Sequence, residues 1–358
     1  MDVRTALALR MTSLLLRGGG PSSVAGVVEW FGAMQAQDVN SALWSLGCRL
    51  PGSTIDDVDA ALEERSVLRT WPMRGTVHIV PAADAHWMLD LMGVRQLAGA
   101  ERRRASLGLD EKTAERAVEI LGTALAGDRL TRAECVAALT EGGIEVSGQR
   151  GYHLLWFAAQ RGVVAIAPHV GKEQTFVLLD EWVPAPRRPS REEALGIVAL
   201  RYFRGHGPTT RRDFAGWTGL TMADCKAGVA AAGKALTTVE VDGADMLMAA
   251  DLPEPTGTGT WLALPGFDEY LLGYKDRSMM ADPEQLAAVI PGGNGVFQST
   301  IVRAGRVVAT WKRTIGRRAV TVTVRPLVGF TATDHRRAAA ALEPYAAFLG
   351  LPLAVKDS

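Results

Sequence analysis

Apolar positions in the first hundred residues follow helical spacing and then give way to two short β-type runs. Val24, Val27, Val28 and Phe31 show the helical spacing, and Ser22-Ser23 stands where a helix cap is expected. The expected helices cover residues 3–17, 24–34, 41–49 and 55–65, with Thr54 as a candidate cap. The expected strands cover residues 66–71 and 76–80, joined by a Pro-Met-Arg-Gly turn, and a helix over 82–92 is expected after them. The pattern therefore predicts helices followed by a two-stranded wing.

The same order of elements recurs twice further along the chain, at a spacing of about 80 residues. In the second copy, the expected helices cover 111–126, 132–141 and 148–161, and the expected strands cover 163–167 and 174–179. In the third copy, the expected helices cover 191–205, 211–217 and 222–232. The expected strands cover 235–241 and 245–250 and are joined by Asp242-Gly243. Residues able to cap these helices are Thr131, Ser147, Thr209 or Thr210, and Thr221. This is the order of a winged helix-turn-helix, although three unrelated α+β pieces would show the same pattern.

The last hundred residues change to a β-rich pattern after a linker over 253–259 that is rich in Gly, Thr and Pro. The expected strands cover residues 261–264, 297–303, 306–314 and 319–326. Turns at Ala304-Gly305 and Gly316-Arg317 would join the last three runs into a meander or small barrel. A helix over 332–349, with Thr331 or Thr333 near its start, follows these strands.

These elements predict an α+β fold with three tandem winged helix-turn-helix units, a C-terminal β-meander or small barrel, and a closing helix. The expected domains cover residues 1–100, 101–184, 190–252 and 260–358, and the first of them carries a Gln-Ala-Gln motif. The chain has 358 residues, of which 47% are hydrophobic, so buried cores in two or three modules are expected.

Charge and cysteine content narrow the class of protein. Lys and Arg number 39 and Asp and Glu number 39, which excludes binding to nucleic acid by bulk charge but not by a local basic face. Cys48, Cys135 and Cys225 form no Cys-x-x-Cys pair, so we expect a reducing compartment and no disulfide framework. The N-terminus lacks a signal-peptide pattern, and apolar runs stay below the roughly 18 residues of a membrane span. We therefore expect a soluble cytoplasmic protein.

Common catalytic and cofactor motifs are missing from the sequence. It contains no HExxH, no P-loop, no GxSxG and no GxGxxG that opens a helix after a strand. The six histidines are scattered, and His78 and His86 lack the spacing of metal ligands on one helix face. We therefore expect neither a metal site nor a cofactor.

Two glutamines stand out in the stretch Met34-Gln35-Ala36-Gln37, between Trp30 and Trp44. They are expected at the end of the helix over 24–34, where Gly, Asn or Ser would serve better. Each amide offers an acceptor and two donors, so the pair is suited to hold one water or one sugar oxygen. The alternative interpretation is a solvated helix end.

Two further groups of residues are candidates for a site. Alternation along the second wing strand places Thr76 and His78 on one face, which predicts a polar cluster on the same wall as the glutamines, or a hydrogen-bonded wing histidine. Basic residues gather in pairs that are either solvated or able to contact phosphates. The candidates for DNA contact are Arg211, Arg212, Lys312, Arg313, Arg317 and Arg318.

Across nearly its whole length the chain resembles the AlkZ/YcaQ-type DNA glycosylases of the winged-helix superfamily. The matching stretches are Met34-Gln35-Ala36-Gln37 with Ala42-Leu43-Trp44, Leu68 to His78, Leu264 to Arg277, and Thr310-Trp311-Lys312-Arg313. Gln35-Ala36-Gln37 matches the Gln-aliphatic-Gln signature of the AlkZ-like branch, whereas Asp replaces the second Gln in the YcaQ-like branch. Asp38-Val39-Asn40 stands where the family has Glu-Pro.

The resemblance implies three tandem winged helices around a DNA-sized channel and the excision of alkylated purines from double-stranded DNA. The lesions would be N7-alkylguanines and, in some members, bulky adducts or interstrand crosslinks. The expected enzyme is a monomeric, monofunctional glycosylase of base excision repair, with Gln37 orienting the water and Gln35 supporting it. The expected supporting residues are Thr76, His78, Trp44 and Arg74.

Two other functions are consistent with the same sequence. A non-catalytic winged-helix regulator or lesion sensor would bind duplex DNA without releasing a base. A protein that sequesters small molecules in the channel would show no salt-sensitive DNA binding. Salt-sensitive binding followed by base release therefore separates the three hypotheses.

Overall fold

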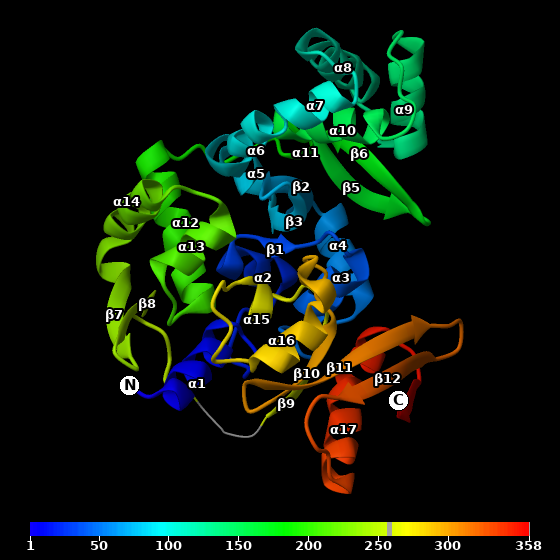
Figure 1. Cartoon of the computed structure of the whole chain (residues 1–358). Helices are drawn as coiled ribbons and strands as arrows, with labels where there is room; N and C mark the ends of the chain where they lie inside the picture. Colours follow the sequence, from blue (N-terminus) through cyan, green and yellow to red (C-terminus); the bar gives the residue numbers. More distant parts are fainter. Residues whose placement is uncertain (256–259, 358) are drawn as a thin grey trace. The chain divides into compact units, whose positions relative to one another are not determined.

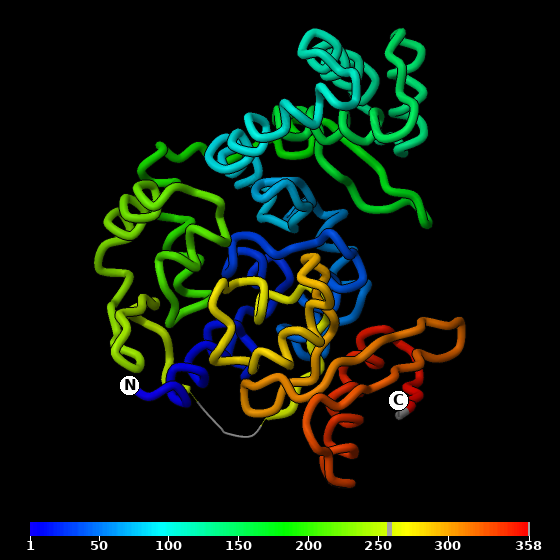
Figure 2. Tube along the Cα trace, in the orientation of Figure 1, coloured from blue at the N-terminus to red at the C-terminus, as the bar shows by residue number. Residues whose placement is uncertain are grey.

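The computed structural model describes residues 1–255 and 260–357 and shows a mixed α+β protein (Figure 1). The chain divides into two compact units, which we call the first and second units. Met1–Val58 and Leu195–Ser358 form the first unit, and Asp59–Ala194 form the second. The tube in Figure 2 traces how the chain leaves the first unit and later returns to it. The expected domain 1–100 thus contributes to both units, and the four expected domain bounds stay a prediction.

Short helices begin the first unit, and each starts at a capping side chain. α1 (Val3–Ser13), α2 (Val24–Phe31) and α3 (Val39–Gly47) follow Asp2, Ser23 and Asp38, whose side chains accept hydrogen bonds from the first turns. β1 (Met34–Gln35) lies between α2 and α3, and α4 (Ile55–Glu63) follows them. The cap predicted at Ser22-Ser23 is therefore confirmed at Ser23.

The elements predicted over 191–250 are confirmed almost residue by residue. They are α12 (Arg191–His206), α13 (Arg211–Thr218), α14 (Met222–Ala232), β7 (Leu236–Val241) and β8 (Ala244–Ala249). Thr210 forms a capping box with Asp213, and Thr221 caps α14. Asp242 and Gly243 turn the β7–β8 hairpin with positive φ angles of 48° and 79°. The assignment of these elements as a winged helix stays a prediction.

One sheet of the second unit joins both wings that the sequence suggested. Its strands are β2 (Val67–Met73), β3 (Thr76–Pro81), β4 (Leu130–Thr131), β5 (Val164–Val170) and β6 (Glu173–Leu178), in the order β3-β2-β5-β6-β4. Arg69 on β2 pairs with Ile166 on β5, which links the two hairpins. The two wings therefore share backbone hydrogen bonds and one buried core.

The helices of the second unit differ from the predictions in two places. α8 (Glu111–Ala124), α9 (Arg132–Glu141) and α10 (Arg150–Gln160) are present, and Thr131 caps α9 as predicted. The cap predicted at Ser147 is wrong, because α10 follows Gln149. The single helix expected over 82–92 is broken into a 3₁₀ turn, α5 (Ala85–Met88) and a π-helical turn over Leu89–Gly93, followed by α6 (Val94–Gly99) and α7 (Glu101–Ser106).

The C-terminal part of the first unit is an open sheet with a helix against it. Its strands are β9 (Trp261–Leu264), β10 (Ser299–Arg303), β11 (Arg306–Ile315), β12 (Val320–Pro326) and β13 (Leu353–Asp357). β9 to β12 are antiparallel neighbours in chain order, which confirms a meander. β13 pairs in parallel with β12 and was not predicted. α17 (Ala332–Phe348), capped by Thr331, packs on β9, and Tyr345 contacts Trp311.

Two short helices, α15 (Glu269–Leu272) and α16 (Pro283–Val289), lie between β9 and β10 in the chain. Residues 256–259 of the expected linker lie outside the described residues. Within the described ranges, no helix has the length and apolar character that a membrane span needs.

Candidate functional site

The glutamine pair lies in an extended segment after α2 rather than in the helix. α2 ends at Phe31 because Gly32 has a φ of 79°, a conformation that glycine adopts at helix ends. The helix expected over 24–34 is therefore too long by three residues, and its placement of the glutamines is wrong. The sequence does hold the signal for this end, since Gly32 is the kind of residue that terminates helices.

Burial alternates along the glutamine segment. Met34 and Ala36 are buried, whereas Gln35 is half-buried and Gln37 is exposed. The two glutamine side chains are therefore the more exposed ones of this segment, and the two apolar side chains anchor it from within.

Asp38 fixes the turn that follows Gln37. Its Oδ1 accepts a hydrogen bond from the Ser41 backbone N–H at 2.6 Å and so caps α3. The same oxygen pairs with Arg313 Nη2 of β11 at 3.2 Å, and Arg313 also reaches Ser41 Oγ at 3.4 Å. One of the predicted DNA-contact residues is thus tied to the residue next to Gln37, although the two are far apart in the sequence.

α3 is held in place by a buried ion pair that the sequence interpretation missed. Arg49 Nη1 and Nη2 bind the two carboxylate oxygens of Asp268 at 2.7 and 2.8 Å, and Ser45 Oγ donates to Asp268 at 2.7 Å. Burial tends to lower the pKa of Arg49, but the Asp268 carboxylate outweighs it and raises that pKa above its usual value. A visible signal was the pair Asp268-Glu269 inside an otherwise apolar stretch, since adjacent acids there need buried partners.

Trp44, predicted as a supporting residue, is buried on the side of α3 that meets the C-terminal sheet. Its Nε1 donates to the Ala263 carbonyl at 2.8 Å, and its ring contacts Tyr345 and Phe348 at centroid distances of 5.3 and 5.4 Å. Through these contacts Trp44 fixes α3 against β9 and α17. Its supporting role in the site stays a prediction.

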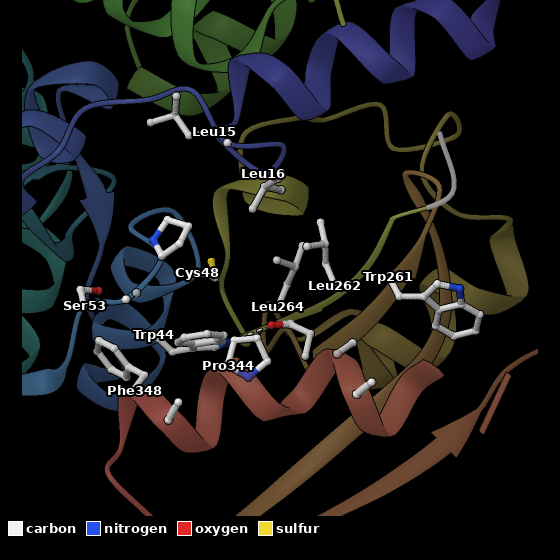
Figure 3. A pocket seen from close by; sticks show the side chains of 18 of the residues that line it. Leu15, Leu16, Trp44, Cys48, Ser53, Trp261, Leu262, Leu264, Pro344 and Phe348 are labelled. Carbon is white, nitrogen blue, oxygen red and sulfur yellow. Dashed lines mark hydrogen bonds between the residues drawn. The ribbon is translucent and has the colours of Figure 1, made fainter. Parts of the chain in front are cut away.

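A large apolar cavity of about 720 Å³ lies next to Trp44 in the first unit (Figure 3). Its walls include Leu16, Leu262 and Phe348, and Cys48 lines it as well. Burial raises the pKa of the Cys48 thiol to about 12, so this cysteine is not a nucleophile at neutral pH. Neither glutamine lines the cavity, whose apolar walls are unsuited to orienting a water. The candidate chemistry therefore lies at the glutamine segment.

Thr76, His78 and Arg74 belong to the second unit and form a compact group of their own. His78 is fully buried, with Nδ1 at 2.9 Å from the Thr76 carbonyl and Nε2 at 3.1 Å from Arg74 Nη2. A carbonyl only accepts and a guanidinium only donates, so His78 is neutral with its proton on Nδ1. Arg74 has a φ of 56° in the turn before β3. The prediction that this group shares a wall with the glutamines, which lie in the first unit, stays a prediction.

The remaining predicted DNA-contact residues lie on exposed parts of the first unit. Arg211 and Arg212 are exposed and begin α13 after the Thr210 cap. Arg317 and Arg318 are exposed in the turn between β11 and β12, and Lys312 is exposed along β11. We call residues 306–326, which include this turn, the basic hairpin. Because Arg313 contacts Asp38, one side of the basic hairpin lies beside the glutamine segment.

No set of three or more His, Cys, Asp or Glu side chains suited to a metal ion occurs among residues 1–255 and 260–357. The chemistry that the described site can perform is therefore argued from its amides and its charged side chains. Two amides that are one residue apart and partly or fully exposed can hold and orient a water or a sugar oxygen.

Comparison with known proteins adds three findings. The sequence model of the AlkZ-like DNA glycosylases matches residues 28–348. The chain is similar to an interstrand DNA cross-link repair glycosylase of Streptomyces sahachiroi, with 29% identity over 327 residues that cover 86% of this chain and 87% of that protein. Its fold is similar to the solved structure of the S. sahachiroi DNA glycosylase AlkZ, with a TM-score of 0.83, 25% identity, and 100% of both chains covered.

Proposed function

The chain belongs to the AlkZ-like DNA glycosylase family, and from this premise we propose that it hydrolyses the N-glycosidic bond of alkylated purines in double-stranded DNA. The observation that carries the proposal is the Gln35-Ala36-Gln37 segment, which presents two amides outward beside the basic hairpin. The substrate class is N7-alkylguanine, with bulky adducts and interstrand crosslinks as further substrates. The similarity to a cross-link repair glycosylase supports this range.

The chemistry of an N7-alkylated purine explains how a site of amides can suffice. The alkylated base carries a positive charge, so its glycosidic bond is already weakened and no general acid is needed to protonate it. Sugar hydrolases, in contrast, rely on a pair of carboxyl groups. The protein has to place a water against C1′ and to stabilise a sugar with oxocarbenium character. Amide oxygens can do both by position and dipole.

The roles proposed for the two glutamines follow from their chemistry and are supported by their exposure. Gln37 is exposed and orients the attacking water, whereas the half-buried Gln35 supports the water or the deoxyribose. A monofunctional glycosylase follows, because the nucleophile is water rather than an amine of the protein. An undamaged base lacks the positive charge and is a poor leaving group, so an amide site also limits cleavage of normal DNA.

The proposed DNA contacts are made by basic and polar side chains. Arg211 and Arg212 at the start of α13 and the arginines of the basic hairpin are placed to contact phosphates. In the second unit, Thr76 and His78 would be second contributors near the lesion strand, with Arg74 as a supporting residue beside His78. Since both ring nitrogens of His78 are engaged, this histidine would shape the second-unit group rather than transfer a proton.

Single-turnover release of 7-methylguanine from a labelled duplex tests the proposed function. The wild-type protein is expected to release the base and to leave an abasic site with both strands intact. Tight, salt-sensitive duplex binding without release from 7-methylguanine or a bulky N7 adduct would instead favour a lesion sensor or regulator. Absence of DNA binding at low salt would refute both interpretations and favour the sequestration of small molecules.

The basic hairpin supplies a separate prediction about affinity. Replacing Arg317 and Arg318 together with alanine is expected to weaken duplex binding and to reduce the slope of log K against log salt by about 2, because each lost phosphate contact accounts for about 0.9. Fluorescence anisotropy at several salt concentrations measures this slope. Arg336→Ala, which removes an exposed arginine from α17, serves as the control and should leave the slope unchanged. An unchanged slope in the double variant would remove the hairpin from the DNA interface.

A further inference from the structure

Glu269 is a buried carboxyl group directly behind the glutamine segment, and the proposed chemistry does not use it. It is 1% exposed and begins α15. Its Oε1 lies 3.4 Å from the backbone nitrogen of Gln35, and its Oε2 accepts a hydrogen bond from Trp217 Nε1 at 2.8 Å. A buried carboxyl group is costly unless it is hydrogen-bonded, so its partners explain why it is tolerated here.

His206 is the third partner of this carboxyl group. Its Nδ1 lies 3.1 Å from the Tyr202 carbonyl and has to donate, because a carbonyl oxygen only accepts. Its Nε2 lies 3.0 Å from Glu269 Oε2, so one proton lies between the imidazole and the carboxyl group. His206 and Glu269 therefore balance each other's charge inside the protein, and this hydrogen bond holds both side chains in one orientation.

The surrounding packing leaves the imidazole ring of His206 no room to move. The ring stacks on Tyr202 at 4.6 Å and meets the edge of Phe31, the last residue of α2, at 5.6 Å. A Cβ added to Gly273 would overlap His206 Cδ2, so α15 approaches the ring as closely as glycine allows. Glu269 is thus connected to the segment that precedes the glutamines through Phe31 as well as through the Gln35 amide.

The neighbouring residue Asp268 holds the other side of the glutamine segment. Its carboxylate binds Ser45 in α3 and Arg49, two residues after α3 ends. Two adjacent acids at the start of α15 therefore hold Gln35 itself, through Glu269, and the α3 region that follows Gln37, through Asp268.

From these contacts we infer that Glu269 is a positioning residue for the glutamine pair. It orients the Gln35 backbone through the N–H group and, through His206 and Phe31, the end of α2. This sets the place where the Gln35 and Gln37 amides meet the water. The part of the inference that concerns excision rests on the proposed function, whereas the part that concerns the Gln35 amide does not.

Glu269→Gln is the informative variant because it keeps the volume and the shape of the side chain. The Glu269 carboxyl group accepts from the N–H groups of Gln35 and Trp217 and shares one proton with His206 Nε2. A glutamine amide has one oxygen and adds an NH₂ group that only donates. Its one oxygen serves either the Gln35 amide or Trp217, so the Gln35 N–H either loses its acceptor or keeps a neutral amide oxygen, which binds it more weakly than a carboxylate does. Glu284→Gln makes the same chemical change at an exposed position of α16 and is the matched control.

Hydrogen exchange of the full-length protein tests the contact itself. In Glu269→Gln, overlapping peptides that cover Met34–Gln37 are expected to lose protection, with the Gln35 amide exchanging at least about tenfold faster than in the wild type. Peptides from α17 and from the second unit should keep their protection, and Glu284→Gln should match the wild type throughout. Unchanged protection at residues 34–37 in a folded Glu269→Gln variant would overturn the inference.

A double-mutant cycle on the single-turnover rate of 7-methylguanine release separates positioning from a general loss of folded protein. Glu269→Gln is expected to lower the rate roughly tenfold to a hundredfold at unchanged duplex affinity. In the Gln37→Ala background, Glu269→Gln should lower the residual rate by a clearly smaller factor than it does in the wild type. The reason is that both changes disturb the same catalytic group. If the double variant lost rate by the product of the two separate factors, the two changes would act independently and Glu269 would have a purely structural role. If the wild type releases no base, the proposed function fails, and hydrogen exchange alone still decides the inference.

Discussion

Gln37→Ala is expected to lower the single-turnover rate of 7-methylguanine release by a factor of about 10² to 10³, with duplex affinity unchanged. Removing one group that is preorganised around a transition state typically costs this much. Gln37 is the exposed member of the pair, so its truncation removes the amide proposed to orient the water without opening a cavity in the core. The measurement is release of the labelled base at saturating enzyme, next to anisotropy titrations with the same duplex.

Two further variants make this result specific. Gln35→Ala should also slow release, because the half-buried amide supports the same water or the deoxyribose. Asn40→Ala removes an exposed amide three positions after Gln37 and should leave the rate unchanged. If Gln37→Ala released the base as fast as the wild type does, the assignment of the water to Gln37 would be wrong.

Breaking the buried Arg49–Asp268 pair is expected to produce the largest loss of stability, about 3–5 kcal/mol in the free energy of unfolding. In Asp268→Asn, the guanidinium of Arg49 stays buried and faces a neutral amide in place of the carboxylate that binds it at 2.7 and 2.8 Å. Ser45 Oγ and the Tyr270 N–H also lose a charged acceptor. Urea denaturation followed by tryptophan fluorescence measures the change, since Trp44 lies on α3 next to this pair.

A second substitution and a surface control show whether the pair itself is responsible. Arg49→Met in the Asp268→Asn background should be less destabilising than the sum of the two single changes, because no unpaired charge then remains buried. Glu115→Gln removes an exposed pair with Arg161 at 3.4 Å and should change stability by less than about 1 kcal/mol. A loss below about 1 kcal/mol in Asp268→Asn would mean that α3 is anchored mainly by apolar packing.

Short-range features of the fold were predictable from neighbouring residues. Thr131, Thr210 and Thr331 form capping boxes at the predicted helix starts, and Asp242-Gly243 forms the predicted hairpin turn. These features depend on residues within about four positions, so the local chemistry is sufficient. The error at Ser147 has the same origin, since a capping residue was available there but α10 begins after Gln149.

Other parts of the fold depend on partners that are distant in the sequence. β13 follows α17 and joins the sheet in parallel with β12, a pairing that periodicity cannot indicate because the register depends on the sheet already being formed. Similarly, the two wings of the second unit join through Arg69 and Ile166. For these two wings, pattern alone identified the four strands of the hairpins and left their assembly undetermined.

For the candidate site, the sequence by itself determined which residues are candidates for the chemistry, and the tertiary structure decided what holds them. The paired amides of Gln35 and Gln37 and the basic residues of the hairpin are visible in the chain, because side-chain type alone states what a group can donate, accept or pair with. Arg49 and Asp268 are 219 positions apart, and Gln35 and Glu269 are 234 positions apart. Such contacts form only after the apolar faces of separate helices and strands have been buried together, so no local pattern of residues specifies them.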